Sequence, residues 1–339
     1  MNKFLQIFII TAVIVMWLLF PKNHYSPTIN GEALGTTYMV KIGHTISQHQ
    51  LDKIKQAIRD ELEDINDKMS TYLNNSELSK FNKWQSLEPF AISESTFKVI
   101  AEAQAVSRIS KGAFDITVGP LVNLWGFGPQ KQQQNPPQKI IEETLQQIGY
   151  KNLKINAQNH TIQKLHPKLQ LDLSAIAKGF AVDSVCQVLI KLSIKNYMVE
   201  IGGEIRVSRF KYGQKTWVIG IESPHYGTIQ EAIPLREMSI ATSGNYRNFR
   251  YDPVTKKRLS HTISPQTGKP IDHNLASVSV VSTTCMYADA MATTLMVLGE
   301  KEGYKLAQQL NLACYFIIHE KPGTYKVLQT DAFIKLGQK

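Results

Sequence analysis

The sequence predicts an α+β fold: a single large mixed α/β domain that follows an N-terminal membrane-spanning segment. Helical and strand-like patterns are both frequent along the chain, but they do not alternate regularly as in a doubly wound sheet. The 339 residues are enough for a sizeable hydrophobic core, and no internal repeat is evident. Hydrophobic residues make up 43% and charged residues 19%, which is typical of a globular protein.

The N-terminal stretch FLQIFIITAVIVMWLLF, residues 4–20, is almost entirely apolar and about as long as a minimal membrane span. No small-x-small cleavage site ends the run, and the first cysteine is Cys186, so neither a cleaved signal peptide nor a lipoprotein is favoured. We therefore expect a signal anchor at 1–22, a linker at 23–30 and one domain at 31–339.

The first half of the domain shows clear helix signals. Apolar residues recur at three- and four-residue steps within 46–70, and Ser93 is a candidate N-cap for a second helix. Pro137 follows a polar loop and suits the first turn of a third helix that ends near Gly149. The predicted elements of this half are a strand at 31–42, helices at 46–70, 93–110 and 137–149, and a hairpin at 151–166.

The second half mixes strands with apolar helices. Its three cysteines, Cys186, Cys285 and Cys314, have neither zinc-ligand spacing nor an even count, so we expect buried free thiols. The predicted elements are helices at 174–193, 285–298 and 300–310, and strands at 196–208, 216–222, 231–236, 276–282, 313–319 and 324–329.

The chain is basic, with a formal net charge of +10 and an isoelectric point near 9.3. This charge indicates an acidic surface, an anionic ligand or an anionic membrane as partner. Because no dense Lys/Arg block is interleaved with aromatic residues, we do not expect nucleic acid binding.

A carboxylate interrupts the apolar helical stretch MYADAMATTLMVLG, residues 286–299. Asp289 and Thr293 are four residues apart and share one helix face. A carboxylate and a hydroxyl together favour a hard cation such as Mg²⁺ over zinc. The alternative is that Asp289 only accepts a hydrogen bond from a nearby backbone N–H. On this pattern alone the hydrogen-bond interpretation is favoured, because Asp and Thr four residues apart are too common to indicate a metal site.

The stretch LDLSAIAKGFAVDSV, residues 171–185, predicts an anion site at a helix N-terminus. Asp172 and Ser174 are candidate caps of that helix. Lys178 would lie in its first turns, where a cation is unfavourable unless an anion is held nearby. The alternative is an ordinary capped helix with a surface lysine, and both interpretations stay open.

Two further stretches offer single side chains. His261 precedes the turn Pro265–Gly268 in HTISPQTGKPI and is a candidate general base, although a lone histidine is more often a polar residue with a satisfied hydrogen bond. Tyr72, in MSTYLNNSEL, is a candidate aromatic platform. Each signal is weak by itself.

In chain order, the motifs are ALGTTY, MSTYLNNSELSKFN, GAFDITVGPLVNLWGFG, DLSAIAKGFAVD, VEIGGEIRV, ATSGNY, HTISPQTGKPI and YADAMATTLMVLG. This series resembles the ApbE-type FAD:protein FMN transferases over roughly residues 31–300. The number and order of the motifs make the resemblance specific, and it implies a domain of the flavin-transferase type.

The resemblance implies a Mg²⁺-dependent enzyme with FAD as substrate. It would join FMN through a phosphoester to a threonine of a target flavoprotein subunit and release AMP. The targets implied are subunits of membrane redox complexes. The catalytic domain would lie in the periplasm, held at the bacterial inner membrane by the N-terminal segment.

Residue by residue, the resemblance implies three groups of site residues. The metal would be held by Asp289, Thr293 and the backbone carbonyl of Ala175, and His261 would take the proton from the acceptor threonine. The FAD site would contain Leu34, Tyr72, Ala113, Phe114, Asp115, Asp172 and Lys178.

One position departs from the family pattern. An aspartate usually follows the H-x-I triplet, and this chain has Ser264 there, which weakens the support for His261 as base. Two other functions remain open: a Mg²⁺-dependent FAD pyrophosphatase that yields FMN and AMP, and a non-enzymatic, membrane-tethered FAD-binding protein. The pyrophosphatase would use the same residues and differ only in how well water is excluded.

Overall fold

The computed structural model describes residues 26–129, 135–225, 227–245, 249–252, 255–321 and 323–337. The predicted anchor at 1–22 lies outside these residues, as do residues 23–25 of the predicted linker; the rest of that linker is described and contains the start of a strand at Thr28. Within the described part, none of the helices is long and apolar enough to cross a membrane.

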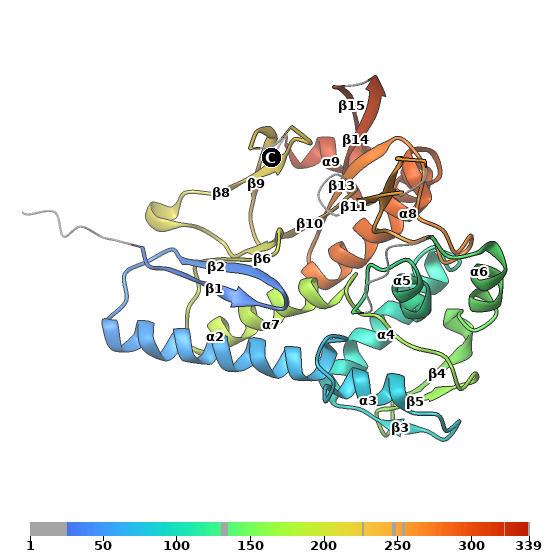
Figure 1. Ribbon diagram of the computed structural model, residues 1–339. Helices are drawn as coiled ribbons and strands as arrows, with labels where there is room; N and C mark the ends of the chain where they lie inside the picture. The colour runs from blue at the N-terminus through green and yellow to red at the C-terminus, as the bar shows by residue number, and fades with distance from the viewer. Residues whose placement is uncertain are drawn as a thin grey trace, which may run out of the picture.

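An eight-stranded antiparallel sheet forms the centre of the molecule, in the order β1-β2-β6-β7-β10-β13-β14-β15 (Figure 1). Strand β13 is buried on both faces, because Val278 and Val280 pack into one apolar core and Ala276 and Val281 into another. The strands are β1 (Thr28–Ala33), β2 (Thr36–Ile42), β6 (Tyr197–Ile201), β7 (Glu204–Val207), β10 (Ser239–Gly244), β13 (Leu275–Ser282), β14 (Ala313–Lys321) and β15 (Thr324–Gln329).

Helices and a small hairpin supply the two cores on either side of this sheet. The larger core contains apolar residues of α2 (Gln48–Met69), α4 (Glu94–Ile109), α7 (Ala177–Lys191) and α8 (Cys285–Gln309). The smaller core contains residues of β8 (Trp217–Glu222), β9 (Ile229–Leu235) and α9 (Asp331–Leu336). The result is a layered α+β domain with α7 and α8 in contact below the sheet (Figure 1).

Short elements complete the structure around α4. A third apolar cluster joins α5 and α6 to Ile263, which lies in the loop that follows β12. The remaining elements are α3 (Glu77–Lys83), β3 (Phe90–Ala91), the 3-10 turns η1 (Ile116–Val118), η2 (Tyr150–Asn152) and η3 (Tyr212–Gln214), α5 (Gly119–Leu124), α6 (Gln138–Leu145), β4 (Leu153–Asn156), β5 (Thr161–Lys164), β11 (Phe249–Tyr251) and β12 (Arg258–Ser260).

Most of the predicted elements are confirmed. Ser93 caps α4 as expected, since its hydroxyl accepts a hydrogen bond from the Thr96 N–H. The three cysteines are buried and free, as predicted. The two helices expected at 285–298 and 300–310 are the halves of α8, separated at Gly299, where φ is 76° and ψ is −177°.

Two predicted strands are wrong in the same way, because each is a hairpin of two strands. The stretch 31–42 contains the β1–β2 turn, where Leu34 and Gly35 both have positive φ angles of 53° and 73°. The stretch 196–208 contains the β6–β7 turn at Gly202 and Gly203, with φ angles of 62° and 100°. Left-handed backbone at both central residues reverses the chain within two residues.

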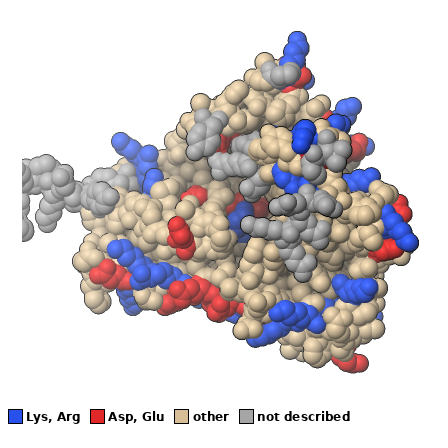
Figure 2. All heavy atoms as spheres, in the orientation of Figure 1, with Lys and Arg blue, Asp and Glu red and all other residues tan. Residues whose placement is uncertain are grey.

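Both acidic and basic side chains lie on the face shown in Figure 2. Along α2 the basic Lys53, Lys55 and Arg59 precede an acidic stretch from Asp60 to Asp67, within which Asp64 pairs with Lys68. The net positive charge is therefore spread out on this face rather than gathered over one element.

Candidate functional site

Two of the predicted site segments meet where α7 starts. The Gly179 N–H donates a hydrogen bond of 2.9 Å to Asp289 Oδ2, so the carboxylate on α8 contacts the first turn of α7. The helices approach closely because residue 179 has no side chain: a Cβ there would lie 2.4 Å from the Cys285 carbonyl oxygen. Asp289 thus accepts a hydrogen bond from a backbone N–H, as the second alternative expects, and its role as a metal ligand stays a prediction.

Oxygen atoms gather around this contact. Asp289 is 4% exposed, and burial raises the pKa of its carboxyl, against the smaller lowering effects of Lys178 and the Gly179 N–H. Thr293, one turn further along α8, shares a hydrogen bond of 3.1 Å with the hydroxyl of Ser243 on β10. Asp289 and Thr293 therefore lie on one face of α8, as predicted, and this face contacts α7 and β10.

Lys178 lies between two buried carboxylates. Its Nζ is 2.5 Å from Glu204 Oε1 at the start of β7. Burial alone would lower the pKa of the Lys178 ammonium, but the charges of Asp289 and Glu204 raise it above its ordinary value. Burial, with repulsion from Asp289, raises the pKa of Glu204 to about 7 although Lys178 opposes the shift. When all three groups are ionised, this cluster carries one excess negative charge.

The predicted capping of α7 by Asp172 and Ser174 is wrong. Asp172 Oδ1 accepts hydrogen bonds from the Ser174 N–H (2.8 Å) and the Ser174 hydroxyl (2.5 Å), and the helix begins only at Ala177 without a side-chain cap. Short polar side chains often form such local turns in place of a cap. Ala175 therefore lies in a turn before α7, with its backbone carbonyl outside the helix.

Tyr72 and Asp172 are neighbours although 100 residues separate them in the sequence. Partial burial raises the pKa of the Tyr72 hydroxyl, and the charge of Asp172 raises it further. The tyrosine is nevertheless 67% exposed, so much of its surface is free to contact a ligand. Leu34 is half-buried in the β1–β2 turn. The contacts of these residues with FAD stay a prediction.

Ala113, Phe114 and Asp115 are buried, and the contacts of Phe114 and Asp115 are structural. The Phe114 side chain belongs to the larger core. Burial raises the pKa of Asp115, while hydrogen bonds from the Thr117 N–H and hydroxyl and from the Tyr150 N–H lower it. Asp115 thereby joins η1 to η2, and the contact of this segment with FAD stays a prediction.

His261 lies just after β12, half-buried, with its ring centroid 6.5 Å from that of Phe127 in an edge-to-face arrangement. The loop that follows is firmly held, because the Trp125 indole donates a hydrogen bond of 2.7 Å to the Gly268 carbonyl. The Ser264 hydroxyl accepts from the Thr267 N–H at 3.3 Å. The hydroxyl of Ser264 therefore stabilises the turn, so its departure from the family pattern leaves the loop ordered.

The structure also adds residues that the sequence reasoning missed. Glu204 and Ser243 both contact predicted site residues, and both lie in motifs that we noted without assigning them a role. The sequence feature that could identify Glu204 is its position directly after a Gly-Gly pair. At such a pair the start of a strand can come close to another element.

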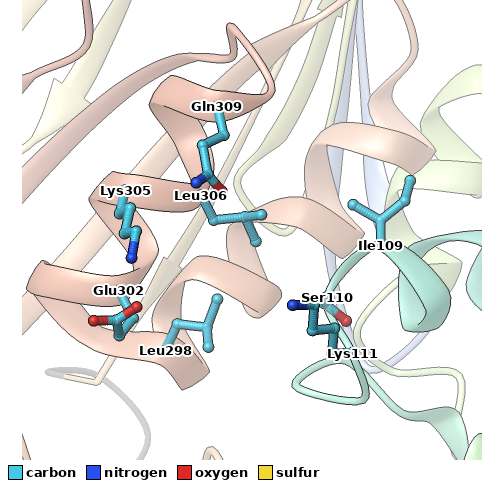
Figure 3. Close-up of a pocket in the computed structure, with 8 residues that line it drawn as sticks. All are labelled: Ile109, Ser110, Lys111, Leu298, Glu302, Lys305, Leu306 and Gln309. Atoms are coloured by element: carbon cyan, nitrogen blue, oxygen red, sulfur yellow. The ribbon is translucent and has the colours of Figure 1, made fainter.

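A hollow of about 220 Å³ between the end of α4 and the second half of α8 is a different feature (Figure 3). Lys111, Glu302 and Lys305 contribute charged groups to it, and none of the predicted site residues lines it. Its lining consists of Ile109, Ser110, Lys111, Leu298, Glu302, Lys305, Leu306 and Gln309.

The donor set around Asp289 fits Mg²⁺. Carboxylate, hydroxyl and carbonyl oxygens are the ligands this ion prefers, and one or two carboxylates suffice when substrate phosphates complete the shell. Glu204 Oε2, near the same cluster, is buried without a hydrogen-bond partner in the described structure. In that same part of the chain, no group of three or more His, Cys, Asp or Glu side chains is arranged to hold a metal ion.

Comparison with known proteins gives consistent results. The ApbE family model matches residues 34–316. FAD:protein FMN transferase of Haemophilus influenzae is 41% identical over 319 residues, which is 92% of this chain and 91% of the relative. The protein of the same name from Vibrio cholerae is 42% identical over 309 residues, or 90% and 91% of the two chains.

Solved structures agree with these sequence matches. The flavin transferase ApbE from Vibrio cholerae has a TM-score of 0.82 and 39% identity, and the match covers 92% of this chain and 99% of that one. The apo flavinyl transferase ApbE of Pseudomonas stutzeri has a TM-score of 0.81 and 32% identity, with 93% and 98% covered. The matches span nearly the whole domain, and the chain belongs to the ApbE family.

Proposed function

We propose that this protein transfers FMN from FAD to a threonine hydroxyl of a target protein and releases AMP. The observation that carries the proposal is the contact between Asp289 on α8 and the first turn of α7, with Lys178 beside it. Relatives with the name FAD:protein FMN transferase support the same reaction.

The chemistry of the cluster suits a pyrophosphate. The Lys178 ammonium and the N-terminal end of α7 both attract negative charge. Asp289, Thr293 and the Ala175 carbonyl would hold a Mg²⁺ ion, which when bound neutralises charge on the phosphates. Negative protein groups and cations would lie close together in this small volume. The phosphates of the substrate could therefore bind without a large excess of either charge.

The transfer itself needs a nucleophile and a base. The acceptor hydroxyl attacks the FMN phosphorus, a new P–O bond forms, and the P–O bond to AMP breaks with AMP as leaving group. A ring nitrogen of His261 takes the hydroxyl proton. This histidine lies beside Phe127 and precedes the ordered loop between Ser264 and Gly268.

The remaining contacts to FAD would come from the residues that the sequence reasoning named. Tyr72 and Asp172 offer an exposed ring and a carboxylate side by side, and Leu34 offers an apolar contact at a hairpin tip. The backbone of Ala113, Phe114 and Asp115 would complete the pocket.

The proposed partners follow from the family and from the N-terminal stretch. We propose flavin-carrying subunits of membrane redox complexes as targets. We also propose that residues 1–22 anchor the protein in the bacterial inner membrane, with residues 31–339 as the transferase domain in the periplasm. The apolar composition of residues 4–20 supports the anchor.

The deciding experiment incubates the purified full chain with FAD, with or without Mg²⁺, and with a candidate acceptor subunit. Mass spectrometry of the subunit should show the mass of one FMN phosphoester, and EDTA or replacement of the acceptor threonine should abolish it. Release of free FMN and AMP without an adduct would show a pyrophosphatase instead. Intact FAD in every sample would contradict both enzymatic functions and favour a flavin-binding protein.

A further inference from the structure

We propose that Glu204 is a positioning residue, which directs the Lys178 ammonium toward the phosphates of the substrate. The inference rests on the proposed function and extends it to a residue that neither the sequence pattern nor the predicted contacts included. It follows from the burial of Glu204, its contact with Lys178 and the shape of the turn before it.

The first step concerns Glu204 itself. It begins β7 directly after the Gly202–Gly203 turn, and its side chain is only 3% exposed. A buried carboxylate is costly unless it is paired and hydrogen-bonded. Its Oε1 contacts Lys178 at 2.5 Å, whereas Oε2 has no partner among the residues that the structure describes. Half of this carboxylate is therefore unsatisfied, which is unusual for a group that serves packing alone.

The second step concerns the path of the lysine. A Cβ at Gly202 would lie 3.3 Å from Lys178 Cδ, so the lysine stem passes directly over the β6–β7 turn. Its neighbour Gly179 binds Asp289 through the backbone. The turn supports the stem, and Glu204 binds the ammonium at its end. A flexible side chain with four rotatable bonds is thus fixed at both points.

The third step concerns charge. Besides Glu204, the carboxylate of Asp289 also attracts the same ammonium, so two carboxylates fix the position of the cation. The arrangement keeps the cation beside the proposed metal ligand Asp289 and prevents it from swinging toward solvent. A phosphate that binds between Lys178 and the first turn of α7 then meets a cation already in place.

The test is a double-mutant cycle on the full chain, with Glu204→Ala, Lys178→Met and the double variant. We measure kcat and KM for FAD at saturating Mg²⁺, and FAD affinity without metal from quenching of flavin fluorescence. Glu204→Ala should lower kcat about 10- to 100-fold. Added to Lys178→Met, the same change should alter kcat less than about twofold, because the group through which Glu204 acts is gone.

FAD affinity gives a readout that does not depend on turnover. With Lys178 present, Glu204→Ala should weaken FAD binding. In the Lys178→Met background, the same change should leave FAD binding unchanged or strengthen it, because it removes a negative charge near the phosphates. A merely structural role would weaken binding in both backgrounds.

Two further variants serve as controls. Glu204→Gln keeps an oxygen that accepts from Lys178 and should restore most of the kcat lost in Glu204→Ala. Glu200→Gln alters a carboxylate of the same hairpin, which accepts from the Gly203 N–H and does not contact Lys178, and should leave kcat unchanged. Urea unfolding of all variants shows whether each one is folded.

The outcomes separate the two proposals. Multiplicative losses of kcat in the double variant, or a Glu204→Ala enzyme within twofold of the parent, would overturn the role of Glu204 while the transferase function stands. A parent chain that neither cleaves FAD nor labels the acceptor would refute the proposed function. In that case the affinity cycle would still decide whether Glu204 directs Lys178.

Discussion

At the scale of single residues, the site depends on close packing between two helices and on one hydrogen bond between them. Gly179 allows α7 to touch α8, and Asp289 uses the N–H exposed there. Buried polar groups such as these are stable only with their partners in place. The chemistry of the site therefore depends on one missing side chain as much as on the charged ones.

Replacing Gly179 by alanine tests this dependence. The new Cβ would lie 2.4 Å from the Cys285 carbonyl oxygen and 2.8 Å from Asp289 Cβ, so α7 must move away from α8. We expect a loss of about 2–4 kcal/mol in the free energy of unfolding, together with loss of flavin transfer. Urea denaturation followed by circular dichroism measures the first effect.

Gly337→Ala is the matched control, since the nearest atom to its new Cβ is 3.7 Å away. It should change the unfolding free energy by less than about 0.5 kcal/mol. A Gly179→Ala protein as stable and active as this control would contradict the close packing of the two helices.

Lys164 gives a prediction about pH. It is almost completely buried, and its ammonium donates to the carbonyls of Asn82 and Trp84 at the end of α3. Burial lowers the pKa of Lys164 to about 8 from an ordinary value of 10.5, so the unfolded chain holds this proton more tightly than the folded one. The cost of the buried charge is present below pH 8 and is relieved as the pH rises from 8 toward 10.5.

We therefore expect the stability of the parent relative to Lys164→Met to increase by about 1–2 kcal/mol between pH 7.5 and 9.5. Urea unfolding of both proteins at several pH values measures the difference, and other titrating groups cancel in the comparison. A constant difference over this range would show that the lysine keeps an ordinary pKa.

At the scale of elements, the kink of α8 is the most specific feature. Gly299 has φ 76° and ψ −177°, a conformation available essentially only to glycine, and the kink brings His273 against the helix. The His273 ring makes a hydrogen bond of 2.8 Å with the Met296 carbonyl through Nε2. Its Nδ1 accepts from the Leu275 N–H, which assigns the Nε2–H tautomer.

Gly299→Ala should cost about 2–3 kcal/mol, because it combines backbone strain with a Cβ only 2.9 Å from the His273 ring. His273→Ala leaves the backbone of the kink intact and should cost less, about 1–2 kcal/mol, because it removes two hydrogen bonds of the ring. Thermal unfolding of the two variants under identical conditions shows which of them loses more stability. Equal losses of stability in the two variants would show that backbone strain at residue 299 adds nothing to the loss of the His273 contacts.

The sequence predicted elements well where one pattern dominates. The 3.6-residue period of α2 and the cap of α4 were read correctly because both signals are local. The two hairpins that were read as single strands differ in how visible they are in the sequence: Leu34 is an unusual residue for a positive φ and hides the β1–β2 turn, whereas Gly202–Gly203 is a recognisable two-residue turn signal for β6–β7. Glu204 was missed for a physical reason: its contact with Lys178 depends on a long-range approach of β7 to α7.

At the scale of the whole molecule, every described element belongs to the domain that begins near residue 26. Deletion of residues 1–25 should therefore leave the urea midpoint unchanged and move the protein from the membrane to the soluble fraction. Fractionation of cells that express both forms, followed by unfolding of the purified proteins, tests this. A truncated chain that stays in the membrane fraction or unfolds at lower urea would contradict the anchor.

The contact between Gly179 and Asp289 joins positions 110 residues apart, so the site can form only late in the synthesis of the chain. A nascent polypeptide that has emerged only as far as residue 280 contains the segment around Lys178 but no Asp289. Beyond Asp289, β14 and β15 must still join the sheet that supports α8. A partly synthesised chain therefore lacks a complete site.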